Sequence, residues 1–379
     1  MSASHAVFHP LPVASVEPVT EDSVAITFDV PPGLAADYAH VQGQHVTIRT
    51  ELAGDDVRRN YSICSPAGSG ILRVAVKRLP GGAFSGHAID ALRPGDVLDV
   101  MTPTGRFFTE LDPASRRHHV CVAAGSGITP VLSIVATTLA VEPRSSVTLL
   151  YGNRTHRSVM FLEELEDLKD TYPDRFQLVH VLSREPQQAE LFSGRIDVQR
   201  MRRLIDGLLP VDAVDEWFLC GPFQMVSDLR RLLVSEGVPK RAVHAEVFHV
   251  DTAAPVQRPT VARTVATTAG DEIAKAAGDA IAEAGAEEAE VTITLDGRRS
   301  SFTLAPDGPS VLEAALAVRA DAPFACRGGV CGTCRARLLE GTVEMDTNWA
   351  LEPEELARGF VLTCQAHPTS DRLAVDYDA

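Results

Sequence analysis

Four cysteines near the C-terminus constrain this chain more than any other feature. Cys326, Cys331 and Cys334 lie together in C-R-G-G-V-C-G-T-C, and Cys364 follows much later in L-T-C-Q. The C-x4-C-x2-C…C spacing is that of plant-type [2Fe–2S] sites, where four thiolates hold two irons. Glycines in such a loop let backbone amides approach sulfur without an intervening side chain. The spacing therefore predicts a one-electron iron–sulfur centre.

Structural zinc is the alternative ligand for four cysteines. Zinc sites usually contain two C-x2-C pairs, whereas this chain has one such pair, a four-residue gap and a distant single cysteine. The other three cysteines show no disulfide-like spacing and are expected to be small buried thiols. They are Cys64, Cys121 and Cys220. Such cysteine usage is typical of a reducing compartment.

Length and charge narrow the class of protein further. A chain of 379 residues is expected to form two or three domains. The net charge of −16, without a long lysine or arginine run, argues against a nucleic-acid partner. The sequence has neither a signal-like N-terminus nor an apolar run of about 18 residues. We therefore expect no membrane association and a cytoplasmic location.

The pattern of apolar residues changes twice along the chain. Short alternating runs separated by glycine and proline turns predict an antiparallel β-barrel at the N-terminus. These runs are 24–30, 45–49, 71–77 and 97–101. From His118 onward, apolar strands alternate with helical patterns, which indicates a doubly wound parallel sheet.

A stretch rich in alanine, threonine and acidic residues follows the second region. It has too few large apolar side chains to fill a core, so we predict a flexible linker, with a weak helix over Asp271 to Glu288. Beyond it, an Asp296-Gly297 turn predicts a hairpin, and Ser310 to Glu313 predicts a capped helix start. The expected divisions are 1–111, 112–250, 251–289 and 290–379.

Two motifs in the first region suit a dinucleotide flavin. Arg59, Tyr61 and Ser62 in R-N-Y-S offer a cation for a pyrophosphate, a planar face for a flavin ring and a hydroxyl for a ring nitrogen. Gly82 and Ser85 in G-G-A-F-S lie at a predicted helix start, where free amides favour a phosphate. An ordinary exposed strand and an ordinary helix cap are the alternatives. Together the motifs favour FAD.

Two glycine loops in the second region suit a pyridine nucleotide. Gly125 and Gly127 in G-S-G-I-T-P follow a buried strand and open a helix, the context expected of a nucleotide loop. A similar loop with Gly221 and Pro222 follows the strand E-W-F-L-C. Two such loops at strand ends would bracket a ligand.

The order of R-N-Y-S, G-G-A-F-S, G-S-G-I-T-P, C-G-P and E-V-F resembles the ferredoxin–NADP⁺ reductase superfamily, and the cysteine loop resembles a fused plant-type ferredoxin. Y-G-N-R-T, H-V-L-S-R-E, M-T-P-T-G-R-F and N-W-A-L-E-P-E-E-L are similar to stretches of the reductase subunits of phenylacetyl-CoA epoxidases. The resemblance implies an FAD barrel, an NAD(P)H-binding α/β domain and a β-grasp ferredoxin domain. The implied cluster ligands are Cys326, Cys331, Cys334 and Cys364.

The resemblance also implies roles for single residues. Arg59 would contact the flavin pyrophosphate, Tyr61 would stack on the flavin ring and Ser62 would approach its N5. Gly82 and Ser85 would hold phosphates. The remaining implied contacts with the flavin or the nicotinamide involve Val76, Lys77, Gly125, Gly127, Thr129, Cys220, Gly221, Pro222, Glu246 and Phe248.

Ser183 and Arg184 lie where NADPH-using relatives grip the 2′-phosphate, with Arg154 as an assisting cation. A solvated loop cation is the alternative for Arg184, and NADH is the alternative donor.

Other titratable residues show no metal-site spacing. His118, His119, His244 and His249 are expected to be surface histidines. The run Glu163, Glu164 and Glu166 is expected on the solvated face of a helix. A di-iron site would need two Glu-x-x-His pairs and two further carboxylates, and the chain has one such spacing alone, Glu246 to His249, so oxygen chemistry would belong to a partner.

The sequence therefore predicts a cytoplasmic reductase that carries electrons from NADPH through FAD and a [2Fe–2S] cluster to an oxygenase. The resemblance favours a di-iron phenylacetyl-CoA epoxidase of phenylacetate catabolism. A reductase for a steroid hydroxylase or an aromatic-ring monooxygenase is one alternative. A non-turnover redox sensor is another, although a sensor would not need the second nucleotide loop.

Overall fold

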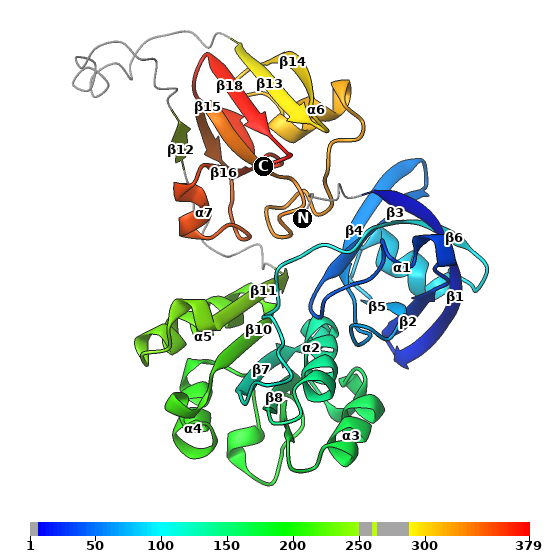
Figure 1. Ribbon diagram of the computed structural model, residues 1–379, viewed down its shortest axis with the longest axis vertical. Coiled ribbons are helices and arrows are strands. Elements are labelled where there is room, and N and C mark those ends of the chain that lie inside the picture. The colour runs from blue at the N-terminus through cyan, green and yellow to red at the C-terminus, as the bar shows by residue number, and fades with distance from the viewer. Residues whose placement is uncertain (1–6, 250–259, 264–287) are drawn as a thin grey trace. The chain divides into compact units, whose positions relative to one another are not determined.

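The computed structural model describes residues 7–249, 260–263 and 288–379 (Figure 1). These residues form two compact units, of which the first holds residues 7–249 and the second holds the rest. The first unit contains two sheets and the second contains one. The predicted three-part architecture is confirmed.

The N-terminal sheet is antiparallel and has the strand order β4-β3-β6-β1-β2-β5. A bridge between Ile63, just after β4, and Val74 in β5 joins the two edges and closes the sheet into a barrel. Its elements are β1 (Phe8–Thr20), β2 (Ser23–Phe28), η1 (Pro32–Leu34), β3 (His45–Leu52), β4 (Asp55–Ser62), β5 (Leu72–Lys77), α1 (Ala83–Asp90) and β6 (Val97–Met101).

Strand β1 lies outside the predicted runs and contains three prolines, which cannot donate to a ladder. The strand changes partner midway, which removes this difficulty. Residues 8–12 pair with β6, whereas residues 13–20 pair with β2. Pro10 and Pro12 therefore lie where the strand is paired on one side alone.

The second sheet is parallel, with the order β11-β10-β7-β8-β9. Helices α2 and α3 flank one face, and α4 and α5 flank the other (Figure 1). The order of strands along the chain reverses between β7 and β10, and ligands of such sheets bind at the carboxyl ends of strands beside this point. The strands are β7 (His118–Ala124), β8 (Ser146–Asn153), β9 (Phe176–Leu182), β10 (Glu216–Pro222) and β11 (Val243–His249).

Helices follow these strands as the apolar pattern predicts. The α-helices are α2 (Ile128–Val141), α3 (Leu162–Thr171), α4 (Val198–Leu208) and α5 (Phe223–Ser235). Short 3-10 helices are η2 (Gly125–Gly127), η3 (His156–Ser158), η4 (Glu190–Phe192), η5 (Val211–Ala213) and η6 (Lys240–Ala242).

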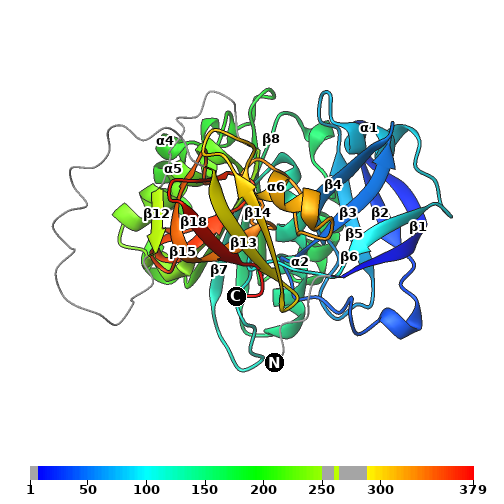
Figure 2. The same cartoon turned by 90° about the horizontal axis from the view of Figure 1, so that it is seen from above.

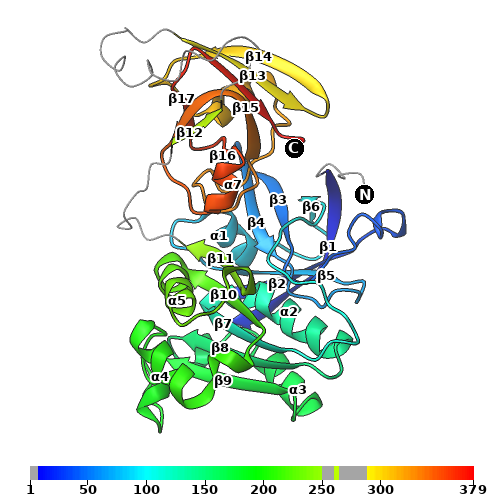
Figure 3. The same cartoon turned by 60° about the vertical axis from the view of Figure 1, so that its left-hand side comes forward.

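The C-terminal sheet has the path β12-β15-β18-β13-β14, with β16 and β17 also pairing with β15. Helix α6 packs against the sheet beside β14 (Figure 2), and α7 lies next to β16 (Figure 3). The elements are β12 (Thr260–Arg263), β13 (Ala289–Leu295), β14 (Arg298–Leu304), α6 (Val311–Val318), β15 (Arg335–Met345), α7 (Pro353–Ala357), β16 (Phe360–Leu362), β17 (Ala366–Pro368) and β18 (Arg372–Asp376).

Two local predictions in this domain are confirmed. Leu295 pairs with Arg298, so Asp296 and Gly297 form a two-residue turn, and both have positive φ, at 53° and 68°. The Ser310 hydroxyl accepts from the Glu313 amide (3.3 Å) and caps α6.

The expectation of a structureless linker over 251–289 is wrong at residues 260–263. These residues form β12, which pairs with β15. Val261 explains the difference, because its side chain is buried in the C-terminal core and offsets the scarcity of apolar residues around it. The weak helix expected from Asp271 onward falls almost entirely outside the described residues.

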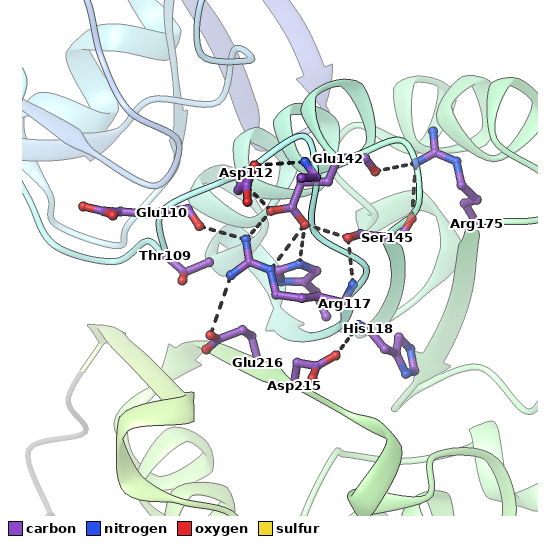
Figure 4. A network of polar contacts seen from close by, with 12 residues as sticks. Thr109, Glu110, Asp112, Arg117, His118, Glu142, Ser145, Arg175, Asp215 and Glu216 are labelled. Carbon is purple, nitrogen blue, oxygen red and sulfur yellow. Dashed lines mark hydrogen bonds and ion pairs between the residues drawn. The ribbon is translucent and has the colours of Figure 1, made fainter.

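A buried polar network fixes the segment between the first and second sheets (Figure 4). The Glu142 carboxylate, at the end of α2, is fully buried and accepts from the Arg117 guanidinium. It also accepts from the Ser145 hydroxyl (2.7 Å) and the Asp112 amide (3.0 Å). Burial by itself would raise the pKa of Glu142, but these hydrogen bonds lower it to about 2.

His119 also contacts Glu142, with 3.3 Å between Nε2 and Oε2, and has no exposed surface. The expectation of a surface position is therefore wrong for His119, which follows one residue after a half-buried His118. His244 is also partly buried, where it stacks on Phe218 (4.6 Å between centroids). The side chain of His249 lies outside the described residues.

Replacing Glu142 with Gln should lower the free energy of unfolding of the first unit by about 3 kcal/mol at pH 7, because it leaves the Arg117 charge without its carboxylate. Urea unfolding measures this loss. The pKa of Glu142 is depressed, so its contribution is present above pH 4.5 and lost as the pH falls towards 2. The difference between variant and wild type should therefore shrink over that range.

The matched control is Glu190→Gln, which removes an exposed carboxylate paired with Arg203 (3.0 Å). Its unfolding transition should match that of the wild type. Equal losses in both variants would contradict a special role for the buried network.

Candidate functional site

The two glycine loops of the second sheet touch each other. A Cβ added at Gly127 would lie 2.3 Å from the Cys220 carbonyl oxygen and 3.0 Å from the Gly221 nitrogen. Such distances exclude any side chain, so the two backbones can approach only because residue 127 is glycine. The loops lie at the ends of β7 and β10, where the strand order reverses. The structure thus brings together the two predicted nucleotide loops.

The surface of this junction leaves room for a ligand. Gly125 has a φ of 54°, and a Cβ added there would meet nothing within 4 Å. Thr129 is buried, and its hydroxyl donates to the Ser126 carbonyl (3.1 Å), which holds the loop in shape. At the end of β8, Asn153 Nδ2 is buried without a hydrogen-bond partner among the described residues. Open backbone and an unpaired donor fit a polar nucleotide.

A carboxyl group from β11 meets the flavin motif of the barrel. The Ser62 hydroxyl donates to Glu246 Oε1 (3.2 Å), which joins residues far apart in sequence. Cys220 is the register neighbour of Glu246 in the adjacent strand and is fully buried. Burial raises the pKa of Glu246 to about 7, although the Ser62 hydrogen bond opposes the shift. Three of the residues that the resemblance implies to be catalytic contacts of the cofactors, Ser62, Cys220 and Glu246, therefore gather at one place, and the Glu246 carboxyl group has a pKa of about 7.

The two flavin motifs also lie side by side. The rings of Tyr61 and Phe84 are 5.3 Å apart, which places R-N-Y-S against the start of α1. Arg59 is exposed, and its guanidinium donates to the Arg58 carbonyl (2.7 Å). No side-chain cap is formed at Gly82, so no capping side chain occupies the first amides of α1. An exposed cation, a half-buried ring and uncapped amides fit a flavin dinucleotide.

Three of the predicted flavin contacts are already engaged within the protein. The Val76 side chain is buried in the barrel core, and Lys77 pairs with Asp22 (3.3 Å). The Ser85 hydroxyl accepts from the Leu79 amide (3.0 Å) and donates to the Gly82 carbonyl (3.2 Å). Contact with a cofactor at these positions would therefore come from the backbone.

The loops that carry Arg154 and Arg184 are tied together. The Arg184 amide donates to the Arg154 carbonyl (2.7 Å), and the Ser183 amide donates to the Asn153 carbonyl (2.9 Å). Glu185, which sequence reasoning missed, accepts from the His156 amide (2.8 Å). Both arginines are exposed. Two cations on one tethered pair of loops suit a phosphate.

Hydrogen bonds also hold the barrel against the second sheet. Arg73 in β5 pairs with Glu164 in α3 (2.5 Å), so the acidic run there is not merely a solvated face. The Ser133 hydroxyl in α2 donates to the Ser65 carbonyl (2.7 Å). Sequence reasoning missed these contacts, since no local pattern marks them.

The cysteine loop of the C-terminal domain presents its thiols in two pairs. Cys326 interacts with Cys331, and Cys334 interacts with Cys364. Hydrogen bonding to Cys331 and to backbone amides lowers the pKa of Cys326, and the Gly328 amide lies 3.4 Å from its sulfur. Arg327, Gly329 and Gly332 have positive φ values of 51°, 73° and 69°, which fold the loop back on itself.

The donor set fits a two-iron cluster better than a single ion. Two pairs of thiols suit a cluster in which each iron takes two of them. The predicted buried thiols Cys64, Cys121 and Cys220 are buried and free.

The titration of Glu246 gives a test of this junction. Its pKa is raised from 4.5 to about 7, so the folded protein holds a proton there that the unfolded chain releases. The stabilising contribution of this proton is present below pH 4.5 and lost as the pH rises through 7. The stability of Glu246→Gln relative to wild type should therefore increase between pH 5 and pH 7 in thermal unfolding. A difference that does not change with pH would contradict a raised pKa.

Comparisons with known proteins agree with these three sites. Matches to protein-family models cover residues 10–109 (oxidoreductase FAD-binding domain), 121–231 (oxidoreductase NAD-binding domain) and 293–369 (2Fe-2S iron-sulfur cluster binding domain). FAD, a pyridine nucleotide and a [2Fe–2S] cluster are therefore its cofactors. None of the helices in the described part of the chain combines the length and apolar character needed to span a bilayer.

The chain is 33% identical over 371 residues to the ferredoxin reductase component of 3-ketosteroid-9-alpha-monooxygenase from Rhodococcus rhodochrous, covering 97% of this chain and 96% of that relative. Its fold is similar to that of phthalate dioxygenase reductase, with a TM-score of 0.57, 23% identity and coverage of 97% and 98%.

It is 42% identical over 372 residues to a component of the 1,2-phenylacetyl-CoA epoxidase from Escherichia coli (strain K12), covering 98% of each chain. Identity of this extent, over all three domains, shows that the chain belongs to the family of reductase components of oxygenases that join FAD-binding, NAD-binding and 2Fe-2S domains.

Proposed function

We propose that this chain is the reductase component of a phenylacetyl-CoA epoxidase and uses NADPH as its electron donor. The observation that carries the partner assignment is the 42% identity to the Escherichia coli epoxidase component, which extends over 98% of both chains. Because that relative is one subunit of the epoxidase, the oxygen chemistry is assigned to a separate di-iron component of the same system.

When bound, FAD would supply the change from a two-electron donor to one-electron transfer, and the cluster would supply one-electron chemistry. Arg59 and the α1 amides neutralise the pyrophosphate, and Tyr61 covers the flavin ring. The pair Ser62 and Glu246 holds a proton at the junction of the barrel and the parallel sheet, where the hydroxyl donates to the carboxyl oxygen.

The glycine loops shape the other half of the site. Gly127 and Gly221 keep the two backbones close, and Thr129 fixes the first loop through its hydrogen bond to Ser126. Cys220 is buried in the apolar cluster beside this junction, and the partly buried Phe248 packs against that cluster. The four thiolates Cys326, Cys331, Cys334 and Cys364 are assigned as the cluster ligands.

A reductase for a steroid monooxygenase is the second candidate, favoured by the 33% identity to the Rhodococcus component. A redox sensor without turnover is disfavoured, because the chain retains both glycine loops expected for a pyridine nucleotide. Residence in the cytoplasm is part of the proposal and is supported by the seven free cysteines.

Reconstitution with separately purified oxygenases tests the partner assignment. We expect NADPH-dependent epoxidation of phenylacetyl-CoA with the oxygenase components of the epoxidase and little turnover with a steroid monooxygenase. Cys331→Ser should lose iron and epoxidation but keep FAD and NADPH-dependent ferricyanide reduction, since the cysteine loop belongs to a separate compact unit. Turnover with the steroid system alone would overturn the assignment, and full epoxidation by Cys331→Ser would overturn the relay.

Replacing Arg184 with Ala tests the donor. Charge-assisted hydrogen bonds to a 2′-phosphate contribute roughly 1.5–3 kcal/mol each, so KM for NADPH should rise about tenfold or more. KM for NADH and kcat should change little, because this binding is equal in ground and transition states. The control is Arg144→Ala. Arg144 is exposed and lies before the amino end of β8, whereas Arg154 and Arg184 follow the carboxyl ends of their strands. Equal effects on both donors would contradict the NADPH assignment.

A further inference from the structure

Gln365 directly follows the fourth cysteine and is almost fully buried, with 8% of its surface exposed. Its side-chain amide joins two segments that are distant in sequence. Nε2 donates to the Arg327 carbonyl (2.9 Å) in the cysteine loop and to the carbonyl of Cys364 (2.9 Å). The same nitrogen lies 3.6 Å from Cys364 Sγ. The amide therefore contacts a thiol predicted to bind iron and the loop that carries the other three.

The amide group is held in orientation from its other end. The Thr347 hydroxyl donates to Gln365 Oε1 (2.6 Å), which fixes which end of the amide faces the sulfur. Thr347 also approaches the loop itself, because a Cβ added at Gly329 would lie 2.8 Å from its hydroxyl oxygen. The segment after β15 thus packs directly on the cysteine loop.

The donor capacity of Gln365 is smaller than the number of acceptors. An amide nitrogen has two hydrogens, whereas three acceptors lie within reach. One hydrogen serves the Arg327 carbonyl, and the other is shared between the carbonyl and the sulfur of Cys364. A thiolate is a stronger acceptor than a thiol, so binding of iron to Cys364 would draw the shared hydrogen towards sulfur.

We propose that Gln365 is a positioning residue that raises the reduction potential of the [2Fe–2S] cluster through its hydrogen bond to the Cys364 sulfur. Reduction adds negative charge to the cluster, and a donor to sulfur stabilises the reduced form more than the oxidised form. The hydrogen bond from Gln365 to the Arg327 carbonyl ties this donor to the cysteine loop. Arg327 has a positive φ of 51°, so the same bond also helps to hold the loop in a strained conformation. The inference rests on the proposed assignment of Cys364 as a cluster ligand.

The test compares the full-length wild type with Gln365→Leu and Thr347→Val. The readouts are iron content and the cluster midpoint potential from a redox titration followed by electron paramagnetic resonance. Gln365→Leu removes the donor, so its midpoint should be more negative than that of the wild type. Thr347→Val leaves the amide but removes its anchor, so its midpoint should shift in the same direction by a smaller amount.

His367→Gln is the matched control, because His367 lies three residues from Cys364 and contacts Asp346 (3.1 Å) rather than the cysteine loop. Its midpoint should equal that of the wild type. A wild-type midpoint in Gln365→Leu with about two irons bound would overturn the proposal, since a purely structural residue would change cluster retention alone.

If Gln365→Leu retains no iron, Thr347→Val decides the question, and an unchanged midpoint in that variant would overturn the proposal. Wild-type protein without about two irons per chain would instead overturn the assignment of the cysteines on which the inference rests.

Discussion

The close approach of two backbones at Gly127 is the constraint on which the site in the first unit depends. The Cys220 carbonyl occupies the space that any side chain at residue 127 would need, with 2.3 Å to an added Cβ. This approach is possible because the strand order reverses between β7 and β10, so that the loops after these neighbouring strands meet at the carboxyl ends of the strands. Glu246 stands on the next strand, beside Cys220.

The junction requires the barrel to be held firmly against the parallel sheet. The Ser62 hydroxyl reaches Glu246 from the end of β4, and Arg73 reaches Glu164 from β5. At the amino ends of the strands, the Glu142 network fixes the segment that connects the barrel to the parallel sheet (Figure 4). Helix α2 links the two ends, because it starts just after Gly127 and finishes just before Glu142. The first nucleotide loop and the polar network are thus joined by a single helix, α2.

The sequence predicted those parts of the structure that depend on local signals. The cysteine spacing, the Asp296-Gly297 turn and the Ser310 cap each lie within a few residues, and the turn and the cap have their expected conformations. The order of the domains was predicted from changes in the pattern of apolar residues along the chain. The family resemblance implied that Ser62 and Glu246 each contact a cofactor, but their direct contact was not predicted, since the two residues are far apart in the chain.

Features that depend on long-range contacts were not predicted, because the partners that stabilise them are distant in the sequence. Strand β1 was not among the predicted runs, and its prolines are tolerated because the strand changes partner midway. Val261 was too isolated to suggest a strand until β15 supplied a partner. His119 read as a polar surface residue because its partner Glu142 lies at the end of the next helix.

The central claim is that the surface where the two glycine loops meet binds the pyridine nucleotide. Titration of the FAD-loaded protein with NADP⁺, followed by the change in flavin absorbance, tests it most directly in Gly127→Ala. The matched control is Gly207→Ala, a glycine in α4 where an added Cβ meets nothing within 4 Å. We expect Gly127→Ala to keep FAD but lose NADP⁺ binding by at least about tenfold, a change of about 1.4 kcal/mol, while the control binds normally. Wild-type NADP⁺ affinity in Gly127→Ala would contradict the account.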